Sequence, residues 1–237
     1  MKPKAWRVVE QLEKQGKLAD IRPTLDALAD QDDVGALKIL AMYSGEGLKG
    51  PDGTIHIRRS AAAANRYYER AAALGDAGAI TVIADVLTKH GGRAELRRGV
   101  VMYRRAIRKG YVTAMHNLAV TYLNAGLHTE AVRWFRRAAT DPNEPDESAL
   151  LEVARAELYG LGTRRNAHTA IQKLEKIARS KSWYYPANSM QHEAMIVLGD
   201  AYVHGWFVPR DYDRGMRWLK RAARSGSKLA EALLTSW

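Results

Sequence analysis

The 237-residue chain contains no cysteine. This absence excludes disulfide frameworks, thiol nucleophiles and cysteine-ligated zinc sites. No apolar run approaches the roughly 18 residues that a membrane-spanning helix requires. The N-terminus starts with basic residues but lacks the apolar stretch of about 7–15 residues that a signal peptide carries behind them. We therefore expect a cytoplasmic protein without a membrane span.

Sequence motifs of catalysis are also missing. The seven histidines form no H-E-x-x-H pair, which is the helical spacing of a zinc hydrolase. Gly45-Glu46-Gly47 and Gly91-Gly92 follow predicted helices instead of strands, so neither forms a phosphate-binding loop. No G-x-S-x-G elbow is present. We therefore expect no enzyme: no catalytic residue, metal site, cofactor or small-molecule substrate.

The positive charge is unevenly distributed. Lys and Arg outnumber Asp and Glu by 37 to 26, a formal charge of +11. Residues 1–47 hold 7 basic and 8 acidic side chains, whereas residues 48–237 hold 30 and 18. Hydrophobic residues make up 46% of the chain, enough for a buried core. A basic surface of this kind favours an acidic partner, either a protein or a nucleic acid.

Residue pairs that contain at least one alanine recur along the chain and predict a helical repeat. They lie 32 to 45 residues apart, at Ala71-Ala72, Ala106-Ile107, Ala138-Ala139, Ile177-Ala178 and Ala222-Ala223. Upstream of each pair, apolar residues at i, i+4, i+5 and i+8 indicate a first amphipathic helix. Glycines follow three of the pairs, at Gly75, Gly110 and Gly226, where left-handed caps are expected. Asn166 and Asp211 are expected to cap the second helices that they precede.

Each unit is therefore a predicted helix hairpin that must stack on its neighbours to bury its apolar face. We expect five units within residues 34–230, at about 34–75, 76–110, 111–142, 146–181 and 190–226. Residues 1–33 and 227–237 are expected to form capping helices at the two ends. Pro23 is placed in the first turn of one of the N-terminal helices.

The fifth unit carries the pattern most clearly, at Ala194, Leu198, Gly199, Tyr202, Gly205, Val208, Asp211, Trp218, Ala222, Ala223 and Gly226. This pattern resembles the Sel-1-like repeat, a branch of the tetratricopeptide superfamily. The fifth unit departs from it at Phe207, where a second loop glycine is usual, and at Gly215, which replaces alanine. The fourth unit has Glu157 and Lys173 where aromatic residues are usual, and the second unit is the most degenerate. The resemblance implies an all-α fold, a right-handed α-solenoid of about five helix hairpins that holds other proteins and performs no chemistry.

Two segments interrupt the repeat pattern. Residues 48–59 contain the turn signal Pro51-Asp52-Gly53, followed by alternation that predicts a short strand. Residues 182–191 hold Trp183, Tyr184 and Tyr185, which lie outside the repeat columns. These aromatic residues either cover the fourth and fifth units as a local core or contact a partner. Trp206 and Phe207 could join them, or only staple the last turn.

One position of the second helix is basic in every unit: Arg70, Arg105, Arg137, Lys176 and Arg221. Because stacked repeats align equivalent positions, these side chains predict a positive stripe. The stripe is either a solvated face, a site for an acidic protein, or a site for nucleic acid. No recognisable nucleic-acid-binding motif accompanies it.

The sequence therefore predicts a non-catalytic scaffold for protein interactions. Two forms of this scaffold remain open. It is either a bacterial signalling or assembly adaptor, or an immunity-type inhibitor of a toxin, both of which the family resemblance allows. The alternative from another class is a basic RNA-binding module. On the concave side of the first helices, the predicted partner-binding residues are His116, Asn117, Thr121 and Arg155.

Overall fold

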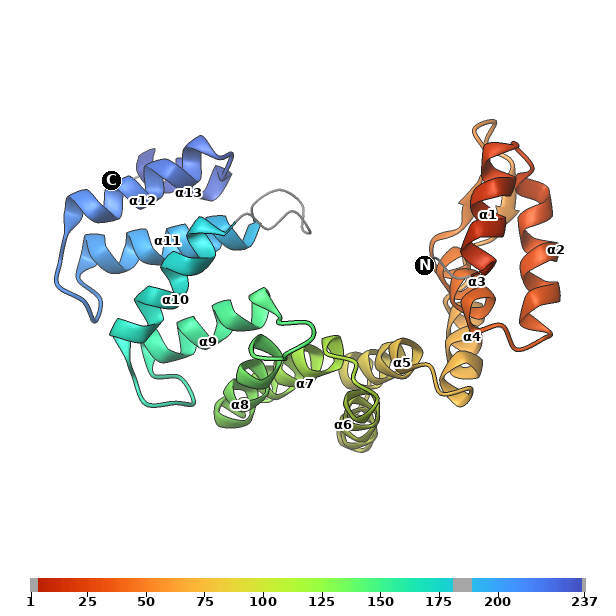
Figure 1. The fold of residues 1–237 in the computed structure, drawn as a ribbon, viewed down its shortest axis with the longest axis horizontal. Coiled ribbons are helices and arrows are strands. Elements are labelled where there is room, and N and C mark those ends of the chain that lie inside the picture. Colours follow the sequence, from red (N-terminus) through yellow and green to blue (C-terminus); the bar gives the residue numbers. More distant parts are fainter. Residues whose placement is uncertain (1–3, 181–188, 236–237) are drawn as a thin grey trace. The chain divides into compact units, whose positions relative to one another are not determined.

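The computed structural model describes residues 4–180 and 189–235 (Figure 1). Most of these residues lie in helices, which confirms the predicted all-α class. The chain divides into two compact units, residues 1–114 and 115–237.

The N-terminal unit contains two helices and two helix hairpins. Its elements are α1 (Lys4–Lys14), α2 (Leu18–Ala29), α3 (Val34–Glu46), β1 (Leu48–Lys49), β2 (Ile55–Ile57), α4 (Ala61–Ala73), α5 (Ala77–His90) and α6 (Arg93–Arg108). Helices α1 and α2 pack on α3, and each later helix packs on the one before it. The strands β1 and β2 pair antiparallel, which confirms the extended segment predicted in the insertion after α3.

The C-terminal unit continues the alternation of first and second helices. Its elements are α7 (Thr113–Asn124), which begins at the boundary, α8 (His128–Ala139), α9 (Glu147–Tyr159), α10 (Ala167–Arg179), α11 (Ser189–His204), α12 (Tyr212–Arg224) and α13 (Lys228–Thr235). Helices α8 to α13 pack in chain order (Figure 1). Among the described residues, α3 to α12 thus form the five predicted hairpins, including α5–α6, whose sequence departs most from the pattern.

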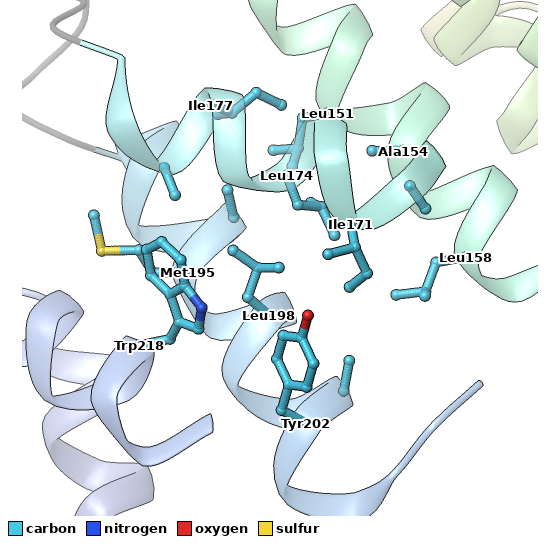
Figure 2. Close-up of a cluster of buried hydrophobic side chains, with 14 of the residues drawn as sticks. Leu151, Ala154, Leu158, Ile171, Leu174, Ile177, Met195, Leu198, Tyr202 and Trp218 are labelled. Carbon is cyan, nitrogen blue, oxygen red and sulfur yellow. The ribbon is translucent and has the colours of Figure 1, made fainter. Parts of the chain in front are cut away.

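The core of the C-terminal unit combines positions of the repeat pattern, such as Leu174 and Leu198, with residues outside it, such as Leu158. Leu158 of α9, Leu174 of α10 and Leu198 of α11 have no exposed surface. Figure 2 shows Leu198 between the α9–α10 side chains and Trp218 of α12. Each helix therefore buries apolar surface against two neighbours, which is how a hairpin too small for its own core becomes stable.

The helix ends follow the predicted capping chemistry. The side chain of Asn166 accepts a hydrogen bond from the backbone N–H of Thr169, and Asp211 accepts one from Arg214. Gly75, Gly110 and Gly226 have φ angles of 89°, 80° and 97°. In this left-handed region glycine avoids the steric penalty of a Cβ atom. Both sets of predicted caps are confirmed.

The placement of Pro23 in a first helical turn was wrong, because α2 begins at Leu18 and Pro23 lies inside the helix. A proline there removes one backbone hydrogen bond of the helix. Ile21 and Leu25 on the same helix are fully buried. The packing of these two side chains against the neighbouring helices outweighs the local preference of proline.

Two glycines bring α11 and α12 unusually close together. A Cβ atom on Gly215 would lie 2.7 Å from the carbonyl oxygen of Gly199 and 2.8 Å from the amide nitrogen of Val203. A Cβ atom on Gly199 would lie 2.6 Å from the Cγ of Leu219. Close backbone contact between the helices thus requires glycine at position 215, and the Leu219 side chain occupies the space of a Cβ atom at position 199.

Candidate protein-binding surface

Three turns of the C-terminal unit lie next to one another and form a continuous edge. They join α7 to α8, α9 to α10, and α11 to α12. Gly162 approaches the backbone of His128 so closely that a Cβ atom would lie 2.3 Å from its carbonyl carbon. On the other side, the ring of Phe207 lies 6.2 Å from the ring of Tyr159. We call this surface the turn edge and define it by Leu127, Leu161, Arg165, Trp206 and Phe207.

The turn edge exposes large apolar side chains. Leu127, Leu161, Trp206 and Phe207 are between 42% and 50% exposed. Single exposed apolar residues are ordinary, but a contiguous set that includes tryptophan is typical of protein interfaces. The structure thus brings Trp206 and Phe207, which the sequence singled out, together with two leucines that it did not. The sequence does present Leu161 as a bulky apolar residue between Gly160 and Gly162 in a turn, which would have marked it as a candidate surface residue.

Phe207 has a φ angle of 62°, a backbone conformation that repeat turns usually reserve for glycine. A non-glycine residue in this region is destabilised by roughly 1 kcal/mol. The ring packs edge-on against Tyr159, and the guanidinium of Arg165 lies 4.4 Å from its centroid. These contacts hold an exposed aromatic ring at a position where glycine would relieve the backbone.

Two depressions flank the aromatic part of the turn edge. One, of about 390 Å³, is lined by Ala167, Ile171, Tyr202, Phe207 and Pro209 among others. The other, of about 160 Å³, has an apolar lining that includes Phe135, Tyr159 and Leu161, with Arg155 at its border. Both could accept an apolar side chain of a partner.

The predicted groove residues of the first helices make contacts within the unit. The His116 Nδ1 lies 2.8 Å from the Asp146 Oδ2, and the His116 ring packs edge-on against Phe135. The Thr121 hydroxyl donates to the carbonyl oxygen of Asn117. Arg155 pairs with Glu193 at 2.6 Å and with Glu152 at 3.5 Å. Of this predicted set, Arg155 is the residue that borders a depression of the turn edge.

The carboxyl group of Glu152 lies beside Arg155 and is partly buried, which shifts its pKa. Removal from water raises the pKa of Glu152, the charge of Arg155 lowers it, and the charge of Glu193 raises it, so that the net pKa lies above its ordinary value. The Arg155 side chain thus lies between the carboxylates of Glu152 and Glu193 and lines the smaller depression.

A buried ion pair occupies the two positions of the fourth repeat where aromatic residues are usual. The Lys173 Nζ lies 2.6 Å from the Glu157 Oε2, and Thr169 donates to the same oxygen. Arg136 donates to the Glu157 Oε1 at 3.2 Å and to the Thr163 hydroxyl at 2.8 Å. Burial raises the pKa of Glu157, but Lys173, Thr169 and Arg136 together hold it below its ordinary value. The sequence marked both positions as departures without indicating that they pair.

The basic residues of the second helices are exposed, as a binding or solvated face requires. In the N-terminal unit, Arg70 pairs with Asp32 at 2.7 Å. In the C-terminal unit, the guanidinium groups of Arg137 and Arg221 lie over Trp134 and Trp218, at 5.4 and 5.5 Å from the ring centroids. Arg105 and Lys176, the other members of this predicted stripe, are also exposed.

The predicted aromatic contact at Trp183, Tyr184 and Tyr185 lies outside the described residues. Within residues 4–180 and 189–235, no group of three or more His, Asp or Glu side chains is arranged to hold a metal ion. In the same part of the chain, no helix combines the length and the apolar character needed to cross a membrane.

The Asp146 carboxylate links the helix cap of α9 to His116, and its charge contributes to stability. Burial raises the pKa of Asp146, but the hydrogen bond from His116 and those from the backbone of α9 outweigh it and hold the pKa below its ordinary value. A group with a depressed folded-state pKa stabilises the fold above its unfolded-state pKa of about 3.9, and this contribution is lost as the pH falls through the folded-state value.

We therefore expect Asp146→Asn, which keeps a capping oxygen, to lower the free energy of unfolding by about 1 kcal/mol at pH 7. The difference from the parent chain should shrink below about pH 4 as the native carboxylate becomes protonated. Urea unfolding at pH 7 and at acidic pH measures both values. A difference that stays constant across this range would contradict the assigned role of the charge.

Comparison with known proteins identifies the repeats. The Sel1 repeat family model matches residues 40–76, 112–143, 148–182 and 192–227, together more than half of the chain. These segments leave out α5 and α6, the hairpin with the most degenerate sequence.

Two curated proteins share part of this sequence. The chain is 30% identical over 146 residues to the uncharacterized protein NMB1327 of Neisseria meningitidis serogroup B, covering 62% of this chain and 28% of that protein. It is 27% identical over 216 residues to the chitin synthase regulatory factor 3 of Schizosaccharomyces pombe, covering 85% of this chain and 21% of that protein. The chain thus spans about a quarter of the length of these relatives.

Solved structures share the fold. A Sel1 repeat protein from Oxalobacter formigenes superposes with a TM-score of 0.70 at 23% identity, covering 94% of this chain and 86% of that one. The protective antigen c5321 of uropathogenic Escherichia coli, described as displaying an SLR fold, gives a TM-score of 0.67 at 23% identity, covering 89% and 42%. Together with the matched repeats and the five hairpins, these likenesses lead to one conclusion: the chain belongs to the Sel1 repeat family.

Proposed function

We propose that this protein is a non-catalytic scaffold that binds another protein, and that the turn edge of the C-terminal unit is a contact surface. The observation that carries the proposal is Phe207, an exposed aromatic residue kept in a strained, glycine-like backbone conformation. Packing does not require a phenylalanine at position 207, because glycine would also fit the turn. Membership of a family built from packing and turn residues supports a binding role rather than a catalytic one.

Two forms of this scaffold follow from the sequence analysis. A signalling or assembly adaptor binds several proteins, whereas an immunity-type inhibitor binds one toxin tightly in a defined stoichiometry. The name of the relative from Schizosaccharomyces pombe, a chitin synthase regulatory factor, is in keeping with the adaptor form. The relative from Neisseria is in keeping with a bacterial origin.

The proposal also places the protein in the cytoplasm, which fractionation of the source cells tests.

Affinity capture from the source cells, followed by mass spectrometry and by sizing of the purified complex, separates the two forms. One partner at a fixed ratio supports the inhibitor, and several partners support the adaptor. Adding nuclease to the lysate tests the RNA-binding alternative, because complexes that depend on RNA are lost. Loss of every captured protein on nuclease treatment would overturn the scaffold proposal.

Phe207→Gly gives a sharper test of the turn edge. The substitution relieves roughly 1 kcal/mol of backbone strain and removes aromatic and cation–π contacts worth about as much. We therefore expect the free energy of unfolding to stay within about 1 kcal/mol of the parent, while affinity for the captured partner falls at least about tenfold. Urea unfolding and calorimetric titration measure the two effects.

Leu229→Ser is the matched control for this test, because Leu229 is an exposed apolar residue of α13 outside the turn edge. It should leave both stability and partner affinity near the parent values. If Phe207→Gly leaves partner affinity unchanged as well, the turn edge is not the contact surface.

A further inference from the structure

The outer face of α6 carries a concentration of positive charge. The helix contains six arginines and one acidic residue, Glu95. The Glu95 Oε2 accepts a hydrogen bond from the backbone N–H of Gly92 at 3.0 Å. The only carboxylate of α6 is thus engaged at the start of the helix, and the rest of the outer face is positive.

Val101 lies at the centre of this face and is 62% exposed. Its neighbours three and four residues away on the helix are Arg97, Arg98, Arg104 and Arg105, all of them exposed. Residues at these spacings adjoin one another on a helix surface. We call this set, with Val101 in the middle, the α6 arginine frame.

Three of the four arginines of the frame have no counterion among the described residues. In the part of the chain that the structure describes, no ion pair includes Arg97, Arg98 or Arg105. In the C-terminal unit, Glu157 neutralises Lys173 of α10 and Glu175 neutralises Arg214 of α12. Like charges three or four residues apart destabilise a helix, and in α6 this spacing separates Arg97 from Arg93 and Arg105 from Arg108. A partner with negative charge would therefore relieve repulsion within α6.

We propose that the α6 arginine frame binds an acidic protein segment that places an apolar side chain on Val101. This inference rests on the proposed scaffold function and names a second surface and the chemistry of its partner. The helix is about 24 Å long, a length that an extended segment of about seven residues spans. Carboxylates of the segment would pair with arginines on both sides of the central contact, in bidentate geometry where they can.

The composition of the face favours a protein over a nucleic acid. Single-stranded nucleic acids bind through aromatic side chains on which their bases stack. Tyr103, the only aromatic residue of α6, is buried, and its hydroxyl donates to Asp85. An aliphatic side chain framed by arginines instead matches an amphipathic acidic segment, since arginine is enriched at protein interfaces.

Fluorescence anisotropy with two labelled synthetic peptides tests the inference on the full-length protein. Both peptides are about ten residues long and rich in glutamate, one with a central leucine and the other with serine in its place. We expect the leucine peptide to bind more tightly. Val101→Ser should weaken it about fivefold, the loss of one buried aliphatic contact, and leave the serine peptide unchanged.

Arg97→Glu combined with Arg105→Glu should weaken both peptides at least about tenfold. The matched control, Arg217→Glu combined with Arg224→Glu, makes the same change of charge at exposed positions of α12 and should alter binding less than about twofold. The milder pair Arg97→Gln and Arg105→Gln gives an intermediate loss, and thermal unfolding of each variant establishes that it is folded.

Three results would overturn the inference: equal binding of both peptides, equal effects of the α6 and α12 variants, or an oligouridine that binds more tightly than either peptide and loses affinity with the α6 arginines. The last result would identify a nucleic-acid site. The scaffold proposal is tested separately by the captured partner. If that partner binds the Arg97→Glu, Arg105→Glu variant normally and the Phe207→Gly variant poorly, the α6 inference fails and the turn edge stands.

Discussion

Gly215→Ala is expected to lower the free energy of unfolding of the C-terminal unit by about 2 kcal/mol, although alanine is the better helix former. The added methyl group would lie within 3 Å of the Gly199 carbonyl oxygen and the Val203 amide nitrogen. Both are backbone atoms, so no change of rotamer relieves the clash. The helices α11 and α12 must move apart, which loosens the packing of Leu219 and Trp218. Urea unfolding followed by circular dichroism measures the loss.

Gly45→Ala provides the control, because it makes the same substitution in a helix of the N-terminal unit. A Cβ atom on Gly45 would have its nearest neighbour, the Cβ of Ala64, at 4.0 Å. This is an ordinary contact, so alanine's higher helix propensity should raise stability by about 0.5 kcal/mol. Opposite signs at the two glycines are expected. A neutral or stabilising Gly215→Ala would contradict the close approach of α11 and α12.

Lys173→Met is expected to lower the free energy of unfolding by about 2 kcal/mol. It leaves the Glu157 carboxylate buried without its nearest cation, and breaking a fully buried pair costs about 3–5 kcal/mol. The smaller value applies because the Lys173 side chain is partly exposed and because Arg136 still reaches the carboxylate. Urea unfolding at pH 7 measures the loss.

The double variant Glu157→Tyr, Lys173→Trp installs the residue types that the fifth repeat has at Tyr202 and Trp218. Replacing a buried ion pair with apolar residues of suitable volume is often neutral or stabilising. We therefore expect the double variant to lie within about 1 kcal/mol of the parent, with each single substitution worse than the pair. A double variant that shows the summed losses of its single variants would mean that the two residues are not coupled.

The sequence allowed the helices to be predicted because the repeat columns are packing positions with a fixed period. Leu198 and Leu174 occupy these columns and are buried as the period requires. The caps were also predictable, because Asp211 and Gly226 act through their own local backbone. In each case the residue type alone determines the structural role.

The binding surfaces were less predictable, because they depend on which turns and faces lie against one another. Leu161 stands out locally between two glycines, but its neighbours in the turn edge depend on how adjacent repeats place their turns, which no local pattern gives. The pairing of Glu157 with Lys173 joins two departures from the pattern across a hairpin. His116 illustrates the opposite case, since a position expected to face a groove is engaged by Asp146 from the following segment.

The Glu157–Lys173 pair also bears on how a chain of similar hairpins assembles in the correct order. Apolar columns that repeat along a sequence allow a helix to collapse onto the wrong partner during folding. If α9 met α12 instead of α10, Glu157 would face Trp218 and lose Lys173, its nearest cation, which is unfavourable for a buried carboxylate. One polar contact in an otherwise apolar series thus distinguishes neighbouring repeats from each other and protects the native order of stacking.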